Sequence, residues 1–181
     1  GGCNITDDPA ITEVFKRMGM ISTSEPPSCK PFSDSADGYV RQEAIAVVVI
    51  SNQQMIQTGG LASIAEILGH CTLSGSGDGI TKPDVHAQEV LYSKVAAMAE
   101  SNLMDPSSVR YIECHGSGTK VGDQVEASAI ANVLKDSNLS LYKNTKYPLH
   151  IGSVKSNVGH TESASGLTGL IKVLLSLENG C

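Results

Sequence analysis

Apolar and polar positions alternate along the chain between strand-like and helix-like patterns. The run from Val47 to Ile50 is continuously β-branched, which is typical of a strand buried on both faces. Ala62 to Leu68 predicts a second strand, although its pattern is ambiguous. After a glycine-rich loop, Asp84 is a good N-cap residue for a helix. The apolar face of this helix is predicted to hold Ala87, Leu91, Val95 and Met98.

The second half of the chain repeats this alternation. Val109 to Cys114 predicts a strand that delivers His115 at its C-terminal end. From Asp123 a helical pattern follows, and Leu149 to Val154 predicts a strand that ends near Lys155. The helix from Asp123 carries Glu126, Ala129, Ile130 and Val133 at helical spacing on one face. Alternating strands and helices favour an α/β layered fold.

The last predicted helix begins near Ser163 and stops at Asn179-Gly180. Gly166 and Gly169 would let it lie close against the sheet. Its apolar face is expected to hold Leu167, Leu170, Ile171 and Leu174. Both histidine segments therefore lie just past strand ends, where α/β folds commonly place their sites.

Composition and charge exclude several classes of function. A chain of 181 residues with a net charge of -6 has an ordinary globular composition and no basic surface for nucleic acid or an anionic membrane. The longest apolar run, Ala44 to Ile50, is far shorter than the roughly 20 residues that cross a bilayer. No signal peptide is visible. The 5 scattered cysteines are typical of reduced thiols, so we expect a cytoplasmic protein.

Candidate metal ligands occur only as neighbours in sequence, in His70-Cys71 and Cys114-His115. Adjacent residues on a strand point to opposite faces, so neither pair makes a natural zinc clamp. We therefore expect no metal site.

The chemistry suggested by the residues alone leaves alternatives open. His115 heads a loop whose glycines allow close approach of a ligand, and whose Ser117 and Thr119 offer hydroxyl groups. Glu126 falls on the apolar face of its helix, and a buried carboxylate is costly unless it is paired. Lys155 is its candidate partner, and His160 follows. A structural ion pair beside a core histidine explains these residues as well as a catalytic site does.

Two long motifs add a family resemblance to this pattern. Glu113 to Asp123, with the order Glu-Cys-His-Gly-Ser-Gly-Thr-Lys-Val-Gly-Asp, resembles the ketosynthase motif Glu-Ala-His-Gly-Thr-Gly-Thr-x-x-Gly-Asp. Gly152 to Glu162 resembles the second histidine motif of the same family, and Cys29 to Arg41 also matches. Nearly the whole chain is therefore similar to the β-ketoacyl synthase domain of animal-type fatty acid synthases or related type I polyketide synthases.

Some positions depart from the family pattern. Many polyketide ketosynthases have Arg-Gly-Glu-Gly where this chain has Arg41 to Ala44; that difference and the ending Lys172 to Gly180 resemble animal fatty acid synthases more closely. The loop from Ser74 to Asp78 lacks the usual Asn-x-Asp-Gly. The resemblance puts the nucleophilic cysteine upstream of Gly1, outside this chain. Cys3 is expected to be a small buried hydrophobic residue instead.

The resemblance implies a thiolase-like fold with α-β-α-β-α layers, present here incompletely. Residues 1–60 would be the end of the N-terminal half, and residues 61–181 most of the C-terminal half. It also implies decarboxylative Claisen condensation between an acyl thioester and malonyl-acyl carrier protein, in fatty acid or polyketide biosynthesis. The intact protein would be a homodimer, and no metal or directly bound cofactor is implied.

Each matched residue has a role that the resemblance implies. His115 and His160 would stabilise negative charge on the malonyl thioester oxygen. Lys155 and Glu126 would form a buried pair that holds the histidines in place. Ser117 and Thr119 would hydrogen-bond the phosphopantetheine arm of the carrier protein. A non-catalytic chain-length subunit is the alternative interpretation, and a small-molecule-binding or structural α/β module is a further one.

Overall fold

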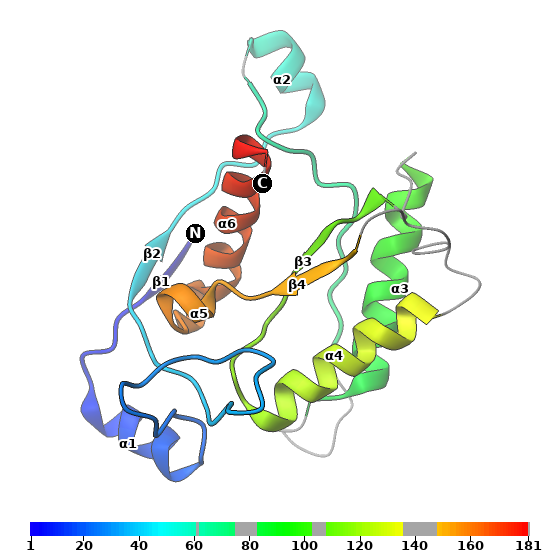
Figure 1. Cartoon of the computed structure of the whole chain (residues 1–181). Helices are drawn as coiled ribbons and strands as arrows, with labels where there is room; N and C mark the ends of the chain where they lie inside the picture. The colour runs from blue at the N-terminus through cyan, green and yellow to red at the C-terminus, as the bar shows by residue number, and fades with distance from the viewer. Residues whose placement is uncertain (61, 75–82, 103–107, 136–147, 181) are drawn as a thin grey trace.

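A computed structural model of the chain describes residues 1–60, 62–74, 83–102, 108–135 and 148–180 (Figure 1). Helices and strands are mixed, as predicted for an α/β fold. The described elements are, in order, β1 (Gly2–Asn4), α1 (Pro9–Arg17), β2 (Ala44–Ala46), α2 (Gln53–Gly59), α3 (Val85–Ser101), β3 (Tyr111–Glu113), α4 (Lys120–Lys135), β4 (His150–Gly152), α5 (Lys155–Val158), the 3₁₀ turn Glu162–Ala164 and α6 (Ser165–Asn179).

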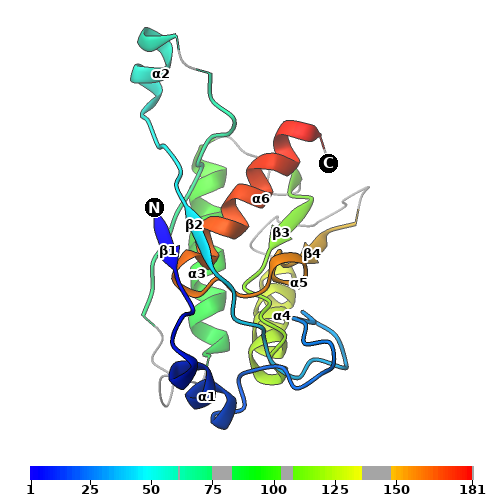
Figure 2. The same cartoon turned by 90° about the vertical axis from the view of Figure 1, so that its left-hand side faces the viewer.

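The parallel pair β3–β4 is the part of the fold that positions the histidine segments. Tyr111 pairs with His150 and Glu113 with Gly152. In Figure 1 the pair runs between α6 on one side and α3 with α4 on the other, and Figure 2 shows the same elements turned by 90°. Successive side chains of β3 face these two layers, since Ile112 lines a cavity with α3 and α4 whereas Glu113 contacts α6 at Gly169. Both predicted strands are confirmed, each in a shorter form.

Helix α4 matches its prediction, whereas α6 matches in extent but not along its whole predicted apolar face, since Leu170 is 37% exposed. The predicted face of α4 is buried, and the helix begins at Lys120, slightly before the expected Asp123. Helix α6 ends at Asn179, and Gly180 after it takes the left-handed conformation of a helix C-cap (φ 68°). A Cβ on Gly169 would come within 3.2 Å of Glu113, so the predicted close approach is confirmed there. It is wrong for Gly166, where a Cβ would meet nothing within 4 Å.

Helix α3 is present, but part of its predicted face is wrong. Ala96 and Ala99 are its buried residues, whereas Met98 keeps 39% of its surface exposed. Ala96 packs on Val133 of α4, with Tyr92 beside them. Small alanines allow α3 and α4 to approach closely, and a search for large apolar residues overlooks such a face.

Two strand predictions are wrong. The described ladder of β2 ends at Ala46, and Val49 beyond it is 94% exposed. Within the described residues the run 47–50 is not assigned to a strand, because a strand requires a hydrogen-bonded partner. Residues 62–68 are irregular as well, and the Leu68 carbonyl accepts from the side chain of Asn102 at 2.7 Å. Cys3 is exposed rather than buried, since it lies on the same uncovered strand face as Ile45, its partner in β2.

Helices α1 and α2 were not expected from the apolar pattern, but both have capping residues. Asp8 accepts from the Ala10 N–H at 2.8 Å, and Asn52 accepts from the Met55 N–H at 2.8 Å. None of the helices in the described part of the chain is long and apolar enough to cross a membrane. The predicted departure at Ser74 to Asp78 lies outside the described residues, apart from Ser74 itself.

Candidate active site

The two motif histidines meet where the parallel strands end. His115 follows β3, and Lys155 opens α5 shortly after β4, so both lie at the carboxyl ends of these strands. The turn after α5, at Gly159, then returns the chain to His160. The centroids of the two imidazole rings are 5.4 Å apart, and the rings meet edge to face at 77°. Sequence positions 45 residues apart are thereby brought to one place.

Glu126 shapes the loop that carries His115. Its Oε1 accepts from the His115 N–H at 2.6 Å, and its Oε2 accepts from the Gly116 N–H at 2.8 Å. The carboxylate is buried, so these two backbone bonds replace the water that it has lost. A helix residue thus fixes the exit of β3.

Asp123, one turn earlier on α4, holds the same loop further along. Its Oδ1 accepts from the Gly118 N–H at 3.1 Å, and its Oδ2 accepts from the Phe32 N–H at 2.7 Å. Gly118 has a φ of 80°, and a Cβ there would come within 2.9 Å of the Lys30 nitrogen. Only glycine suits this position, because the backbone atoms of Lys30 and Gly38 lie directly against it.

The predicted ion pair between Lys155 and Glu126 is wrong. The Nζ of Lys155 donates to the His115 carbonyl at 2.6 Å, and no described ion pair joins it to Glu126. The two side chains instead bind the same backbone segment at His115 and Gly116. Both Glu126 oxygens accept from its N–H groups, and Lys155 donates to its carbonyl. Burial lowers the pKa of Lys155, and the carboxylates of Glu113 and Glu126 oppose that shift.

His160 is held by backbone on both sides. Its N–H donates to the Val40 carbonyl at 2.7 Å, and its own carbonyl accepts from the Gln42 N–H at 3.0 Å. The Glu162 N–H donates to Nδ1 of the ring at 2.9 Å. A nitrogen that accepts this bond carries no proton, so the proton of the neutral ring is on Nε2. His160 therefore presents Nε2–H as a donor.

Both imidazoles favour their neutral form. Burial, reinforced by the ammonium of Lys155 and by His115, lowers the pKa of His160 to about 4. Burial and then Lys155 also lower the pKa of His115. His115 keeps an exposed surface, whereas His160 is the more enclosed of the two residues. At neutral pH the pair offers hydrogen-bond donors without positive charge.

These shifts predict that stability falls as acid is added. An unfolded histidine has a pKa of about 6.5, whereas that of His160 in the folded chain is about 4. Between these values the unfolded state binds more protons, so the stabilisation is complete above about pH 6.5 and is lost as pH falls toward 4. Urea unfolding at pH 7.5, 6 and 5 measures this, and His160→Gln should flatten the dependence. An equal slope in the variant would contradict the assignment.

The two hydroxyl residues of the loop lie beside each other. Ser117 is only 4% exposed, and its Oγ is 3.1 Å from that of Thr119. Thr119 is half-buried and more accessible. Their predicted role in holding a phosphopantetheine arm stays a prediction.

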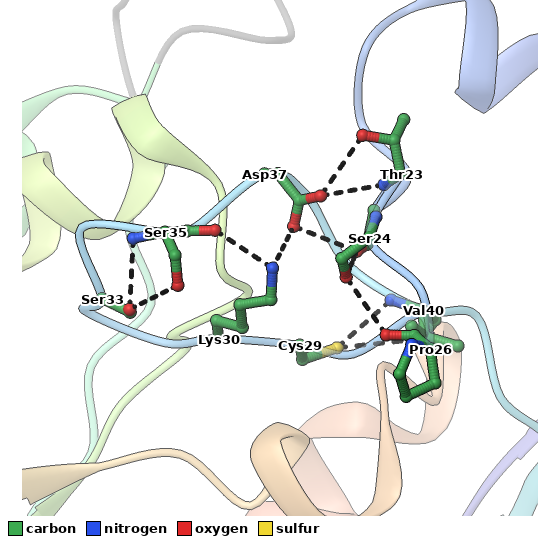
Figure 3. A network of polar contacts seen from close by, with 10 residues as sticks. Thr23, Ser24, Pro26, Cys29, Lys30, Ser33, Ser35, Asp37 and Val40 are labelled. Carbon is green, nitrogen blue, oxygen red and sulfur yellow. Dashed lines mark hydrogen bonds and ion pairs between the residues drawn. The ribbon is translucent and has the colours of Figure 1, made fainter.

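A polar network stiffens residues 22–40, which support the loop from the other side (Figure 3). Asp37 accepts from Lys30 Nζ at 3.2 Å, from Ser22 Oγ at 3.0 Å and from the Thr23 N–H at 3.0 Å. Desolvation would raise the pKa of Asp37, but the hydrogen bonds from Lys30, Ser22 and Thr23 outweigh it and lower that pKa to about 2. Gly38 then donates to the Gly118 carbonyl at 2.9 Å, which joins this segment to the histidine loop.

Sequence reasoning missed the role of Glu113. Its Oε1 accepts from the Val154 N–H at 2.6 Å, directly before Lys155. Its Oε2 is 2.8 Å from the Nζ of Lys172 on α6. Glu113 therefore connects α6 to the segment that carries Lys155. Its place at the start of the first histidine motif was the signal that could have shown this.

The described cysteines offer no activated nucleophile beside the histidines. Burial, with the charge of Glu126, raises the pKa of Cys114 to about 12, and burial raises that of Cys29. A thiol with a raised pKa is a poor nucleophile at neutral pH. Among the described residues, no group of three or more histidine, cysteine or acidic side chains is placed to hold a metal ion.

Two cavities lie in the described part of the chain, one beside the candidate site and one away from it. A polar one of about 350 Å³ is lined by residues 155–159 and by the opposing segment that includes Cys29, Val40 and Gln42. The other is apolar, about 390 Å³, and lies between residues 66–69, β3, α3 and α4. The apolar cavity is lined by none of the predicted site residues His115, Glu126, Lys155 and His160. The polar cavity, with Lys155 in its wall, is the one that adjoins the candidate site.

The chain is similar to known proteins over nearly its whole length. Residues 64–181 match the family model "Beta-ketoacyl synthase, C-terminal domain", and residues 1–55 match "Beta-ketoacyl synthase, N-terminal domain". Probable polyketide synthase 1 of Dictyostelium discoideum is 36% identical over 99% of this chain. Polyketide synthase 2 of Metarhizium guizhouense is also 36% identical, again over 99%. The chain spans only 6% and 8% of the length of these two proteins.

Solved structures show the same relationship. The oxazolomycin ketosynthase domain of Streptomyces albus superposes with a TM-score of 0.80 and 28% identity, over 96% of this chain and 28% of that one. The ketosynthase from module 6 of the bacillaene synthase of Bacillus subtilis gives 0.79 and 29%, over 96% and 30%. The division of this chain near residue 60 stays a prediction. The fold is that of the thiolase-like ketosynthases, and the chain belongs to the β-ketoacyl synthase family.

Proposed function

We propose that the chain is part of a ketosynthase that condenses an acyl thioester with malonyl-acyl carrier protein. The observation that carries this proposal is the meeting of His115 and His160, with ring centroids 5.4 Å apart and a donor Nε2–H on His160. A neutral donor on His160 with a second neutral imidazole beside it suits an oxygen that gains negative charge during the reaction. The anchored Lys155, on the carbonyl of His115, keeps this arrangement rigid.

In the proposed reaction the malonyl carboxylate leaves as carbon dioxide. The electron pair of the broken carbon–carbon bond moves into an enolate, whose oxygen the two histidines would stabilise. The enolate carbon then attacks the acyl thioester carbon, and the carbon–sulfur bond breaks to release the thiolate of the nucleophile. We propose that this nucleophile is a cysteine upstream of Gly1, because neither Cys29 nor Cys114 is activated.

The partners follow from the same chemistry. Phosphopantetheine on an acyl carrier protein would bring both thioesters, and Ser117 and Thr119 are the proposed contacts for its arm. The relatives named above are polyketide synthases, so we propose a polyketide or fatty-acyl product. A cytoplasmic homodimer is the proposed state of the complete protein.

The test is condensation by the complete ketosynthase that contains this chain. Given acylated enzyme and malonyl carrier protein, it should release carbon dioxide and yield a β-ketoacyl product in equal amounts. Translation of the upstream coding sequence should show a cysteine followed by small hydroxyl residues.

A non-catalytic chain-length subunit is the second candidate. The ishigamide ketosynthase/chain length factor structure resembles this chain with a TM-score of 0.81 at 25% identity. A glutamine or another non-nucleophile at the upstream position, together with no product, would favour that subunit.

A further inference from the structure

We infer that Arg41 and Glu162 are positioning residues for His160. Their ion pair holds the peptide N–H of Glu162 against Nδ1 of the ring, which keeps the ring proton on Nε2, where it faces the reacting oxygen. The inference rests on the proposed function, since it assigns the task of Nε2 from that reaction.

The backbone of Glu162 is in an unfavourable conformation. Its φ is 43°, which is the left-handed region that residues with a side chain rarely adopt. This conformation aims its N–H at Nδ1 of His160, at 2.9 Å. A strained residue persists only where its surroundings hold it, so something must hold Glu162 there.

The Arg41 guanidinium is what holds it. Nε donates to Glu162 Oε1 at 2.7 Å, and Nη2 donates to Oε2 at 3.0 Å. Two parallel bonds from a planar fork fix the direction of the carboxylate as well as its distance. The side chain of Arg41 is 8% exposed and that of Glu162 is 20% exposed, so water competes little for the pair.

Arg41 itself is anchored away from the histidines. Its Nη1 donates to Thr12 Oγ1 at 2.6 Å, and its guanidinium carbon lies 5.3 Å from the centre of the Phe15 ring. Both contacts come from α1. Beside it, the backbone of residues 40–42 is bonded to His160. Contacts therefore run from α1 through Arg41 and Glu162 to Nδ1 of His160, the atom that sets the tautomer of the ring.

The alanine and glycine variants of Glu162 separate geometry from charge. Both remove the carboxylate, but glycine adopts a positive φ readily and alanine does not. If the direction of the N–H is what matters, the kcat for condensation should fall about 30-fold in Glu162→Ala. In Glu162→Gly the fold-loss of kcat should be at least five times smaller. A loss of stability alone would follow the same order, since alanine is strained at a positive φ, but it would lower acylation of the nucleophile together with condensation.

The experiment uses the complete ketosynthase, with acylation of its nucleophile as a check of folding. Arg41→Met should lower kcat about tenfold or more, with the KM for malonyl carrier protein unchanged within about twofold. The kcat of Arg41→Lys should lie between those of the parent and of Arg41→Met, since an ammonium keeps the charge but does not form two parallel bonds. Arg17→Met is the matched control: it breaks an arginine–glutamate pair on α1 whose arginine is 78% exposed, and it should change nothing.

The outcomes separate this inference from the proposed function. If His160→Ala lowers condensation whereas Arg41→Met and Glu162→Ala leave kcat unchanged, the positioning role is overturned and the proposed function stands. Equal losses in Glu162→Gly and Glu162→Ala overturn the geometric role as well. If His160→Ala leaves condensation intact, the proposed function fails.

Discussion

Replacement of His160 by alanine in the complete ketosynthase is expected to lower the condensation rate by about 10² to 10³, as when one oxyanion donor is lost. The reason is that Nε2–H of this ring is a donor already aligned before substrate arrives, because Nδ1 accepts from the Glu162 N–H at 2.9 Å. Steady-state formation of β-ketoacyl product measures the loss. Acylation of the nucleophile should persist, since the proposed role of His160 concerns only the malonyl oxygen.

A matched control for this variant is His86→Ala. The side chain of His86 is 84% exposed on α3, and its surface contact with Glu89 is worth little. His115→Ala should resemble His160→Ala, because the two rings lie 5.4 Å apart. A loss below about threefold in both histidine variants would refute the oxyanion role.

Much of the C-terminal half could be predicted from the sequence because its elements carry their own patterns. Glu126, Ala129, Ile130 and Val133 recur at helical spacing, and all are buried on α4. Strands β3 and β4 pair with each other within the chain, so their predicted segments form. The run 47–50 failed for the opposite reason: a β-branched sequence is compatible with a strand, but it does not supply the partner that a strand needs.

The candidate site was only partly predictable. The two motifs located the histidines, and the resemblance to ketosynthases gave them a role. The helical pattern indicated that Glu126 is buried, but it could not say which donors satisfy it, so the pairing with Lys155 was wrong. The contact of Arg41 with Glu162 joins positions 121 residues apart. A local pattern of charges carries no information on such a pair.

The second large effect is expected from Glu126→Ala, which should lower the free energy of unfolding by about 3 to 5 kcal/mol, because a buried carboxylate that accepts two backbone hydrogen bonds is removed. The substitution leaves the N–H groups of His115 and Gly116 without acceptors, and each buried unmatched N–H costs about 1 to 3 kcal/mol. It also removes a negative charge near the ammonium of Lys155, a residue that is only 5% exposed. Urea unfolding of the complete ketosynthase domain measures the loss.

Glu126→Gln separates the acceptor role from mere size. Glutamine keeps the shape and one carbonyl oxygen, but its NH₂ group would face a backbone N–H, so we expect about half the loss of Glu126→Ala. Gln124→Ala is the control on the same helix, at an exposed position, and it should stay within about 0.5 kcal/mol of the parent. The condensation rate of these variants should fall in the same order as their free energy of unfolding, since the loop that carries His115 loses its two hydrogen bonds to Glu126. A loss under about 1 kcal/mol in Glu126→Ala would show that water replaces both bonds and that the loop holds its shape without the carboxylate.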